Sequence, residues 1–219
     1  MESDSAIESE AYAWMRGHLA GFIRFDGERV AIKIAPLADG RFVAPVMVAM
    51  LIAADTVIEL PDDGENDLHL MMSLEKFDER ADADGCADRW RTYHGDPADV
   101  NWAWITVDAA KFRGYFIDGE VFCAPNALAT GEAGVCRAIN ATQRDLVRAA
   151  IHAQFRTDAT DPLVVGVDPL GFDVRRQFGV LRLRAPRGIA ICDEGSALNA
   201  LKALANDPEQ AARTAPKVL

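Results

Sequence analysis

Four residues on one predicted strand have side chains that could hold a flat, charged ligand. Trp102 and Trp104 lie two residues apart, so their rings share one face of a strand expected over residues 102–114. Two such rings can pack against a planar ring system, although aromatic residues on strands also fill cores and dimer interfaces. Lys111 and Arg113 repeat this spacing and could pair with an anionic group, or lie at a solvated strand edge. No catalytic residue is identified.

The histidines are candidates for a haem ligand, because haem needs one axial imidazole in an apolar pocket with cations for its propionates. His94 stands out, since Arg91 and Tyr93 adjoin it at the end of a predicted helix. The other histidines are His18, His69 and His152. Their sequence neighbours do not identify any of the four as a ligand.

An acidic run is expected to form a short loop between two strands. Its carboxylates are Asp62, Asp63, Glu65 and Asp67. The run lacks the regular spacing and the closing glutamate of a calcium-binding loop. It is typical of a solvated hairpin tip, and no metal site is predicted.

The composition limits the partners and the compartment. The chain of 219 residues has 23 Lys and Arg against 34 Asp and Glu, a formal net charge of −11. Such a charge repels nucleic acid and anionic membranes, so neither is an expected partner. The longest apolar stretch, residues 42–54, is shorter than the roughly 20 residues that a membrane-spanning helix needs. The first ten residues are polar and acidic, unlike a signal peptide, and the four cysteines form no C-x-x-C pair. A cytoplasmic protein with reduced thiols is expected.

Short strands at close spacing dominate the first half of the sequence. Asp-Gly turn signals at residues 26–27 and 39–40 separate runs of alternating apolar and polar residues, which predicts β-hairpins. Helices are expected over residues 6–19 and 86–94. Strands are expected over residues 20–27, 28–37, 41–47, 56–61, 68–77, 102–114 and 115–122. Antiparallel strands with few helices between them favour a barrel or a sandwich.

A second group of elements follows residues 125–126. A helix is expected over residues 132–155, and then two strands that flank the turn Asp168-Pro-Leu-Gly171. Pro169 presets its φ angle and Gly171 tolerates a positive φ angle, so the chain should reverse there. A third strand over residues 179–186 and a helix over residues 196–205 complete the group. Residues 207–219 are expected to form a flexible tail.

The stretch Gly166-Val-Asp-Pro-Leu-Gly-Phe-Asp-Val-Arg175 resembles the motif G-V-D-x-x-G-F-D-V-R in the small C-terminal domain of HugZ-like haem-utilisation proteins. Members of that family open this domain with a His-Met-Asn-x-Asp-His signature. In this sequence Asn140 is kept, whereas Ala138 and Gln143 stand at the histidine positions and Thr142 at the aspartate position. The resemblance therefore implies the fold, and it transfers no histidine function to this stretch.

The order of strands in the first half resembles the FMN-binding split barrel of pyridoxamine 5'-phosphate oxidase and its relatives. Those proteins hold the FMN phosphate with Arg or Lys on early strands and with a Ser/Thr-x-x-Ser-x-Lys loop. The resemblance implies phosphate-binding roles for Arg29 and Lys33, with Arg41 nearby, and a ring-binding role for Trp102. Residues 48–55 stand where the loop is expected, and they contain neither a cation nor a hydroxyl group.

The expected fold is α+β, with an antiparallel split β-barrel over residues 10–125 and an α-β-β-β-α domain over residues 128–206. The resemblance implies a homodimer that binds FMN or another flat heterocycle. The first hypothesis is a flavin-binding protein, acting as an FMN-dependent oxidoreductase on a small planar substrate. Its cofactor-binding candidates are Arg29, Lys33, Trp102, Lys111 and Arg113. Two alternatives stay open. One is a non-catalytic regulatory module that has lost its cofactor, as some relatives with this domain pair bind an enzyme of tetrapyrrole synthesis. The other is a haem-binding or haem-utilisation protein.

Overall fold

The computed structural model describes residues 4–61, 64, 67–97 and 101–206. The chain divides into two compact units, residues 1–125 and residues 126–219, and each unit is considered by itself below. The expected flexible tail lies outside the described residues, as does most of the acidic run at residues 62–67.

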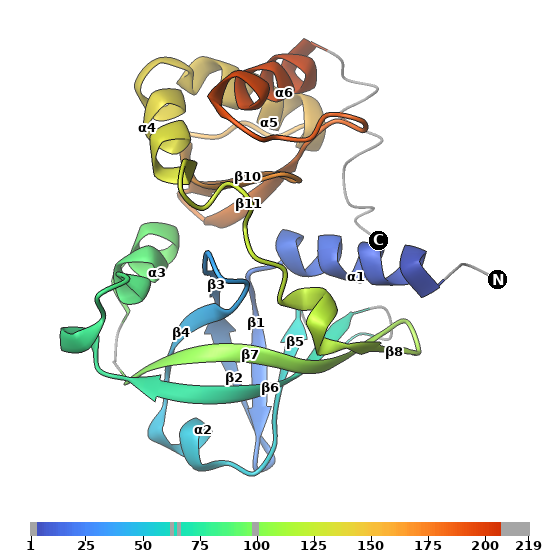
Figure 1. Ribbon diagram of the computed structural model, residues 1–219, viewed down its shortest axis with the longest axis vertical. Coiled ribbons are helices and arrows are strands. Elements are labelled where there is room, and N and C mark those ends of the chain that lie inside the picture. The colour runs from blue at the N-terminus through green and yellow to red at the C-terminus, as the bar shows by residue number, and fades with distance from the viewer. Residues whose placement is uncertain (1–3, 62–63, 65–66, 98–100, 207–219) are drawn as a thin grey trace. The chain divides into compact units, whose positions relative to one another are not determined.

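The first unit is a curled antiparallel sheet accompanied by helices (Figure 1). Its elements are α1 (Asp4–Gly17), β1 (Ala20–Phe25), β2 (Glu28–Lys33), β3 (Ala35–Pro36), β4 (Phe42–Val46), α2 (Val48–Ile52), β5 (Thr56–Leu60), β6 (Leu68–Phe77), the 3-10 helix η1 (Glu79–Ala81), α3 (Cys86–His94), β7 (Asn101–Phe112), β8 (Tyr115–Asp118) and the 3-10 helix η2 (Gly119–Phe122). The strands are ordered β2-β1-β5-β6-β7-β4-β3, and β8 pairs with β7. The split barrel expected from the sequence is thus a curled antiparallel half-barrel.

The long strand β7 organises the half-barrel. One edge of β7 pairs with β6 along its whole length, whereas the other edge is shared by β4 near its start and β8 near its end. The register shifts between Met71 and Met72 of β6, which leaves Asp108 of β7 as the extra residue of a β-bulge in β7. The inner face is fully apolar along a row of paired residues that crosses five strands. That row is Ile23, Ile58, Leu70, Ala110 and Ile117.

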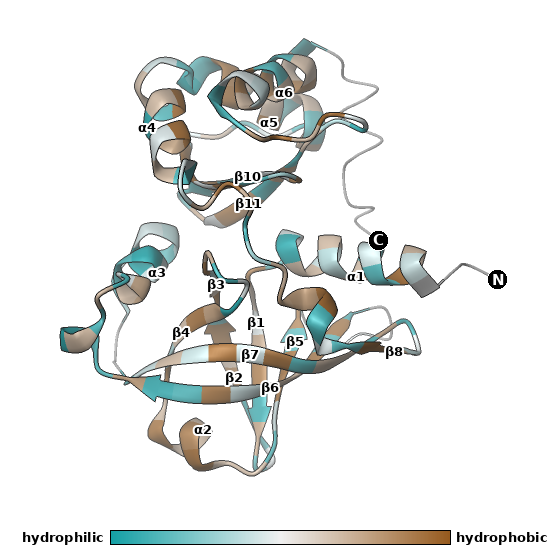
Figure 2. Ribbon diagram, in the orientation of Figure 1, coloured by the Kyte–Doolittle hydropathy of each residue, from teal (hydrophilic) through white to brown (hydrophobic). Residues whose placement is uncertain are grey.

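Helix α2 is apolar on its exposed side as well as its buried side (Figure 2). Met50 is buried, whereas Met47, Val48 and Ile52 are exposed. This helix occupies the stretch where the barrel resemblance expects a phosphate-binding loop. No helix in the described part of the chain has the length and apolar character needed to cross a membrane.

The second unit consists of three helices and a three-stranded antiparallel sheet. Its elements are α4 (Glu132–Thr142), α5 (Arg144–Phe155), β9 (Leu163–Asp168), β10 (Gly171–Arg176), β11 (Gly179–Arg184) and α6 (Glu194–Asn206), with the sheet ordered β11-β10-β9. Side chains of all six elements form one apolar core, centred on Ile151, Phe172 and Leu201. The α+β fold class predicted from the sequence is thus confirmed.

Two local features refine the prediction for this unit. The single helix expected over residues 132–155 is two helices, because Gln143 has φ −123° and ψ 18° and interrupts the helical backbone. The turn glycine Gly171 has φ +149°, and a Cβ atom there would lie 2.0 Å from the carbonyl oxygen of Leu183. The glycine of the motif is therefore required by close backbone approach.

Candidate functional site

Arg29 of β2 forms an ion pair with the buried carboxylate of Glu59. Its Nε lies 2.9 Å from Oε2 of Glu59, which is 0% exposed, and Nε of Arg24 lies 3.5 Å from Oε1. The guanidinium of Arg29 also lies 3.6 Å over the ring of Phe22. A buried carboxylate without cations would be costly, so these arginines are needed by the fold.

Three of the predicted cofactor-binding cations, Arg29, Lys33 and Lys111, lie on one face of the sheet. Lys33 ends β2 on the face that carries Arg29. Paired residues link Ala31, also on that face, to Lys111 through β1, β5 and β6, so Lys111 faces the same way. Four strand spacings separate β2 from β7, which corresponds to about 19 Å along the sheet. Lys33 and Lys111 are both exposed.

Trp102 is a packing residue in this unit. It is 2% exposed, and its Nε1 donates a hydrogen bond to Oε2 of Glu79 at 2.8 Å. Its ring meets that of Trp90 edge-on, with 5.7 Å between centroids, and the guanidinium of Arg91 lies 5.2 Å from its centroid. Hydrogen bonds from Arg91 and then from Trp102 lower the pKa of Glu79 below its usual value. The ring of Trp102 therefore has no open face for a planar ligand.

Arg113 departs from the expected shared face with Lys111. Strand β7 ends at Phe112, and Arg113 has φ +49° in a two-residue turn with Gly114 at φ +86°. Two positive φ angles are typical of the tight turn that joins paired strands, so the side chain leaves the strand face. The guanidinium of Arg113 lies 2.7 Å from Oε1 of Glu10.

Three side chains of α3 donate hydrogen bonds to backbone carbonyls of the segment from β2 to β3. The pairs are Trp90 with Lys33 (2.8 Å), His94 with Ile34 (2.9 Å) and Arg89 with Pro36. Because a carbonyl oxygen only accepts, Nε2 of His94 carries a proton. His94 was the histidine that stood out in the sequence. In the structure its hydrogen bond to Ile34 helps to hold α3 against the sheet.

Two other histidines are also engaged in the first unit. Nδ1 of His18 donates to the carbonyl oxygen of Trp14 at 2.8 Å, and the two rings lie 4.5 Å apart. His69 is half-buried in β6, paired in register with Glu59 on one side and Lys111 on the other. Neither residue lines a described cavity.

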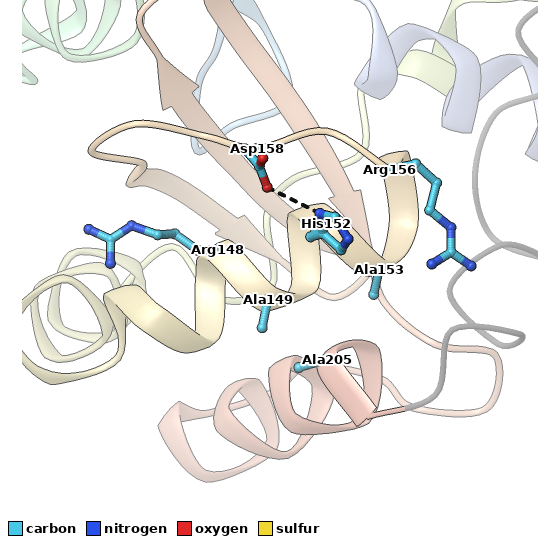
Figure 3. A pocket seen from close by; sticks show the side chains of 7 residues that line it. All are labelled: Arg148, Ala149, His152, Ala153, Arg156, Asp158 and Ala205. Carbon is cyan, nitrogen blue, oxygen red and sulfur yellow. Dashed lines mark hydrogen bonds and ion pairs between the residues drawn. The ribbon is translucent and has the colours of Figure 1, made fainter.

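A groove between α5 and α6 in the second unit is lined by basic side chains (Figure 3). Its volume is about 390 Å³. Three alanines form its small, apolar lining, and the remaining lining residues are charged or titratable. The lining consists of Arg148, Ala149, His152, Ala153, Arg156, Asp158 and Ala205.

His152 lies at the centre of this groove. Arg148 precedes it by four residues, one helical turn away, and Arg156 follows it as the left-handed C-cap of α5. Nδ1 of His152 donates a hydrogen bond to Oδ1 of Asp158 at 3.1 Å. No hydrogen bond or ion pair is formed by Nε2 of His152 within the described part of the chain. Figure 3 shows the two arginine side chains extending to opposite sides of the imidazole.

Sequence reasoning found His152 but missed the rest of this site. The i, i+4, i+8 spacing of Arg148, His152 and Arg156 was the available signal. Among the described residues, no group of three or more His, Cys, Asp and Glu side chains is arranged to hold a bare metal ion. The groove can therefore offer one imidazole and two guanidinium groups to a ligand.

Comparison with known proteins identifies the fold but not the function. No family model and no curated protein matches the chain. A protein of unknown function from Agrobacterium tumefaciens has a similar structure, with a TM-score of 0.71 and 13% identity, over 94% of this chain and 97% of that one. A haem-binding protein from Mycobacterium smegmatis is matched over 93% of this chain and 97% of its own, with 19% identity and a TM-score of 0.39. The second match is too distant to support an argument.

Proposed function

We propose that this protein binds haem or a closely related flat, anionic tetrapyrrole, without acting as a flavin oxidoreductase. The observation that carries the proposal is His152, which lies in the α5–α6 groove between two arginines with its Nε2 unbonded. The resemblance of the second unit to HugZ-like haem-utilisation domains supports the same ligand class. The groove volume of about 390 Å³ falls within the range of roughly 300–1,000 Å³ for small-molecule sites.

The residues implied for FMN do not fit that cofactor. A phosphate dianion needs charge-assisted donors that are free to reach it, and Arg29 is held by Glu59. An isoalloxazine ring needs an open aromatic face, and Trp102 is buried. The segment in place of the phosphate-binding loop is the apolar helix α2. These contacts favour a binding role over the flavin-enzyme hypothesis.

The groove offers side chains of the types that bind haem, and it holds them at the surface: the side chain of His152 is 58% exposed and that of Asp158 is 98% exposed. When bound, haem would supply an iron centre for ligand binding or redox chemistry. His152 would hold the iron through Nε2, and Asp158 accepts a hydrogen bond from its Nδ1, as carboxylates do beside metal-bound imidazoles. Arg156 forms no ion pair within the described residues and would bind a propionate, while Arg148 would do so by exchanging its present carboxylate partners. The alanines leave room for the edge of a planar ring.

Absorbance titration tests this function. Purified protein titrated with hemin should develop a Soret band that saturates at one equivalent, and titration with FMN should leave the flavin spectrum unchanged. His152→Ala should abolish the saturable band, whereas the matched variant His69→Ala should keep it. Retention of FMN by the purified protein would instead support the flavin hypothesis. A protein that takes up neither ligand would support the regulatory module that has lost its cofactor.

A further inference from the structure

Strand β8 has one paired edge and one open edge. It pairs with β7 across the turn Arg113-Gly114, and no described strand lies on its other side (Figure 1). The turn has φ angles of +49° and +86°, which are typical of a type I′ hairpin whose first hydrogen-bonded pair is Phe112 and Tyr115. Hydrogen-bonded pairs alternate with non-bonded pairs along such a ladder, so the N–H and C=O of Phe116 point away from β7. No backbone group of the described residues bonds to them.

The first residues of this strand have large side chains that are open to solvent. Phe116 is 79% exposed and Tyr115 is 45% exposed, whereas the next residue, Ile117, is buried in the half-barrel. An exposed apolar edge strand is a template for pairing with another chain, because its free backbone groups and its side chains would both gain contacts from a neighbouring strand. Strand β8 combines these two properties.

The edge strands of the second unit are protected from such pairing. The side-chain amide of Gln154 bonds to the N–H and the carbonyl oxygen of Arg184 in β11, at 3.2 and 3.5 Å. The amide of Asn140 bonds to the same two groups of Val164 in β9. Each amide therefore occupies backbone groups that an added strand would need.

The other edge strands of the first unit are also unsuited to pairing. Strand β3 has two residues, and its Pro36 lacks an N–H and accepts from Arg89 through its carbonyl oxygen. Strand β2 carries the charged residues Glu28, Arg29 and Lys33, and charges on an edge strand oppose association. Among the described strands, β8 is therefore the edge that is both apolar and unprotected.

We propose that β8 pairs antiparallel with β8 of a second copy of this chain, around a twofold axis at Phe116. This inference goes beyond the haem-binding function and does not depend on it. On the axis, the outward N–H of Phe116 in each copy donates to the outward carbonyl oxygen of Phe116 in the other. The two phenyl rings then lie side by side, and Tyr115 of each copy meets Ile117 of the other. No like charges face each other in this register.

The charges at the two ends of β8 favour a second copy in this orientation. Lys111 and Arg113 lie near the start of the strand, since Lys111 pairs with Phe116 and Arg113 belongs to the preceding turn. Asp118 and Glu120 lie at its end. An antiparallel partner brings the basic end of one strand to the acidic end of the other, which offsets part of the repulsion between two chains of net charge −11. A parallel partner would instead place like charges together.

Sedimentation velocity of the full chain at physiological ionic strength tests the pairing. The unmodified protein should convert from monomer to dimer as its concentration rises. Phe116→Lys places two like charges on the axis and should raise the dimer dissociation constant about tenfold or more. Phe178→Lys is the matched control, because Phe178 is 81% exposed in the β10–β11 turn, and it should change that constant by less than about twofold. A protein that stays monomeric at every concentration would overturn the proposal, as would equal effects of the two substitutions.

Hydrogen exchange of the unmodified protein tests the register without any substitution. The N–H of Ile117 points toward β7 and should be protected at every concentration, whereas the N–H of Phe116 should become protected only as the dimer forms. A dimer in which the Phe116 amide exchanges as fast as in the monomer would have its interface elsewhere, and the proposal would be wrong. Because neither measurement uses a ligand, both outcomes are independent of the hemin titration.

Discussion

The side-chain amide of Asn140 forms a two-point hydrogen bond with the backbone of Val164. Nδ2 donates to the carbonyl oxygen of Val164 at 2.8 Å, and the N–H of Val164 donates to Oδ1 at 2.9 Å. Strand β9 is at the edge of its sheet, so Asn140 replaces a missing neighbouring strand. Val167 of the same strand is bonded in a similar way. Its N–H donates to Oε1 of Glu132 at 3.0 Å, and its carbonyl oxygen accepts from Nδ2 of Asn126 at 2.9 Å. Asn140 thus has a structural role in this chain.

Replacing Asn140 should destabilise the second unit. Asn140→Ala leaves the N–H and the carbonyl of Val164 without their partners, which should lower the free energy of unfolding by about 2 kcal/mol. Denaturant unfolding followed by circular dichroism measures the loss. Thr142→Ala, at an exposed position of the same helix, is the control and should change little. Equal stabilities of the two variants would contradict the edge-protecting role.

Both aspartates of the C-terminal motif bind one arginine. Nη1 of Arg182 lies 3.0 Å from Oδ1 of Asp173, and Nη2 contacts Oδ1 of Asp168. All three side chains are buried. The two aspartates are therefore explained by this ion-pair network within the sheet, which needs no ligand.

Removing the arginine from this network should be severe. Arg182→Met leaves two buried carboxylates without their cation, and the free energy of unfolding should fall by about 3–5 kcal/mol. Arg187→Met removes an exposed arginine soon after the same strand, and should be nearly neutral. Thermal unfolding of both variants provides the comparison. A small effect of Arg182→Met would mean that the carboxylates are hydrated rather than buried.

Patterns of local sequence were enough to predict most of the fold. The Asp26-Gly27 turn and the alternation around it predicted the β1–β2 hairpin. An Asp-Gly pair favours the positive φ angles of a tight turn, and the alternation of apolar and polar residues can be read from the sequence itself. Gly171 was predicted as a turn residue on the same grounds. The break at Gln143 was not predicted, since residues on both sides of it favour helix and the interruption is not marked by Gly or Pro.

Contacts between distant residues could not be predicted in the same way. Arg29 and Glu59 are 30 residues apart, and their ion pair depends on the order β2-β1-β5, which brings two non-consecutive strands to the sides of β1. The groove depends on α5 packing against α6, although three strands separate them in the sequence. The spacing of the basic residues around His152 can be read from the sequence, whereas the packing of α6 against their helix cannot.

Arg29 offers a test that separates a structural role from cofactor binding. Arg29→Ala removes the closer cation of a buried carboxylate, and the free energy of unfolding should fall by about 2 kcal/mol. Lys33→Ala, at the exposed end of the same strand, should change stability little. Differential scanning calorimetry and FMN titration of both variants should show a lower melting temperature for Arg29→Ala and no FMN-binding difference. Loss of bound FMN with unchanged melting would instead indicate a phosphate-binding arginine.

Glu79 should contribute to the acid sensitivity of the first unit. Hydrogen bonds from Arg91 and from Trp102 lower its pKa below the ordinary value of 4.5. The folded state therefore holds the ionised form more strongly than the unfolded state, so this stabilisation is present above pH 4.5 and is lost as pH falls through the lowered pKa. Glu79→Gln should flatten the dependence of melting temperature on pH in the interval below pH 4.5. Parallel curves for the two proteins over that interval would contradict this assignment.

Two cysteines should differ sharply in reactivity. Burial raises the pKa of the Cys86 thiol above its usual value of 9.0, so at neutral pH it is protonated as well as shielded. Cys192 is exposed just before α6, with its Sγ 3.5 Å from Oγ of Ser196. Iodoacetamide at pH 7.5 should therefore modify Cys192 at least tenfold faster than Cys86, as measured by peptide mass spectrometry over time. Because the thiolate is the reacting species and the pKa of Cys86 is raised by burial, Cys86 should react only once denaturant opens the packing around α3.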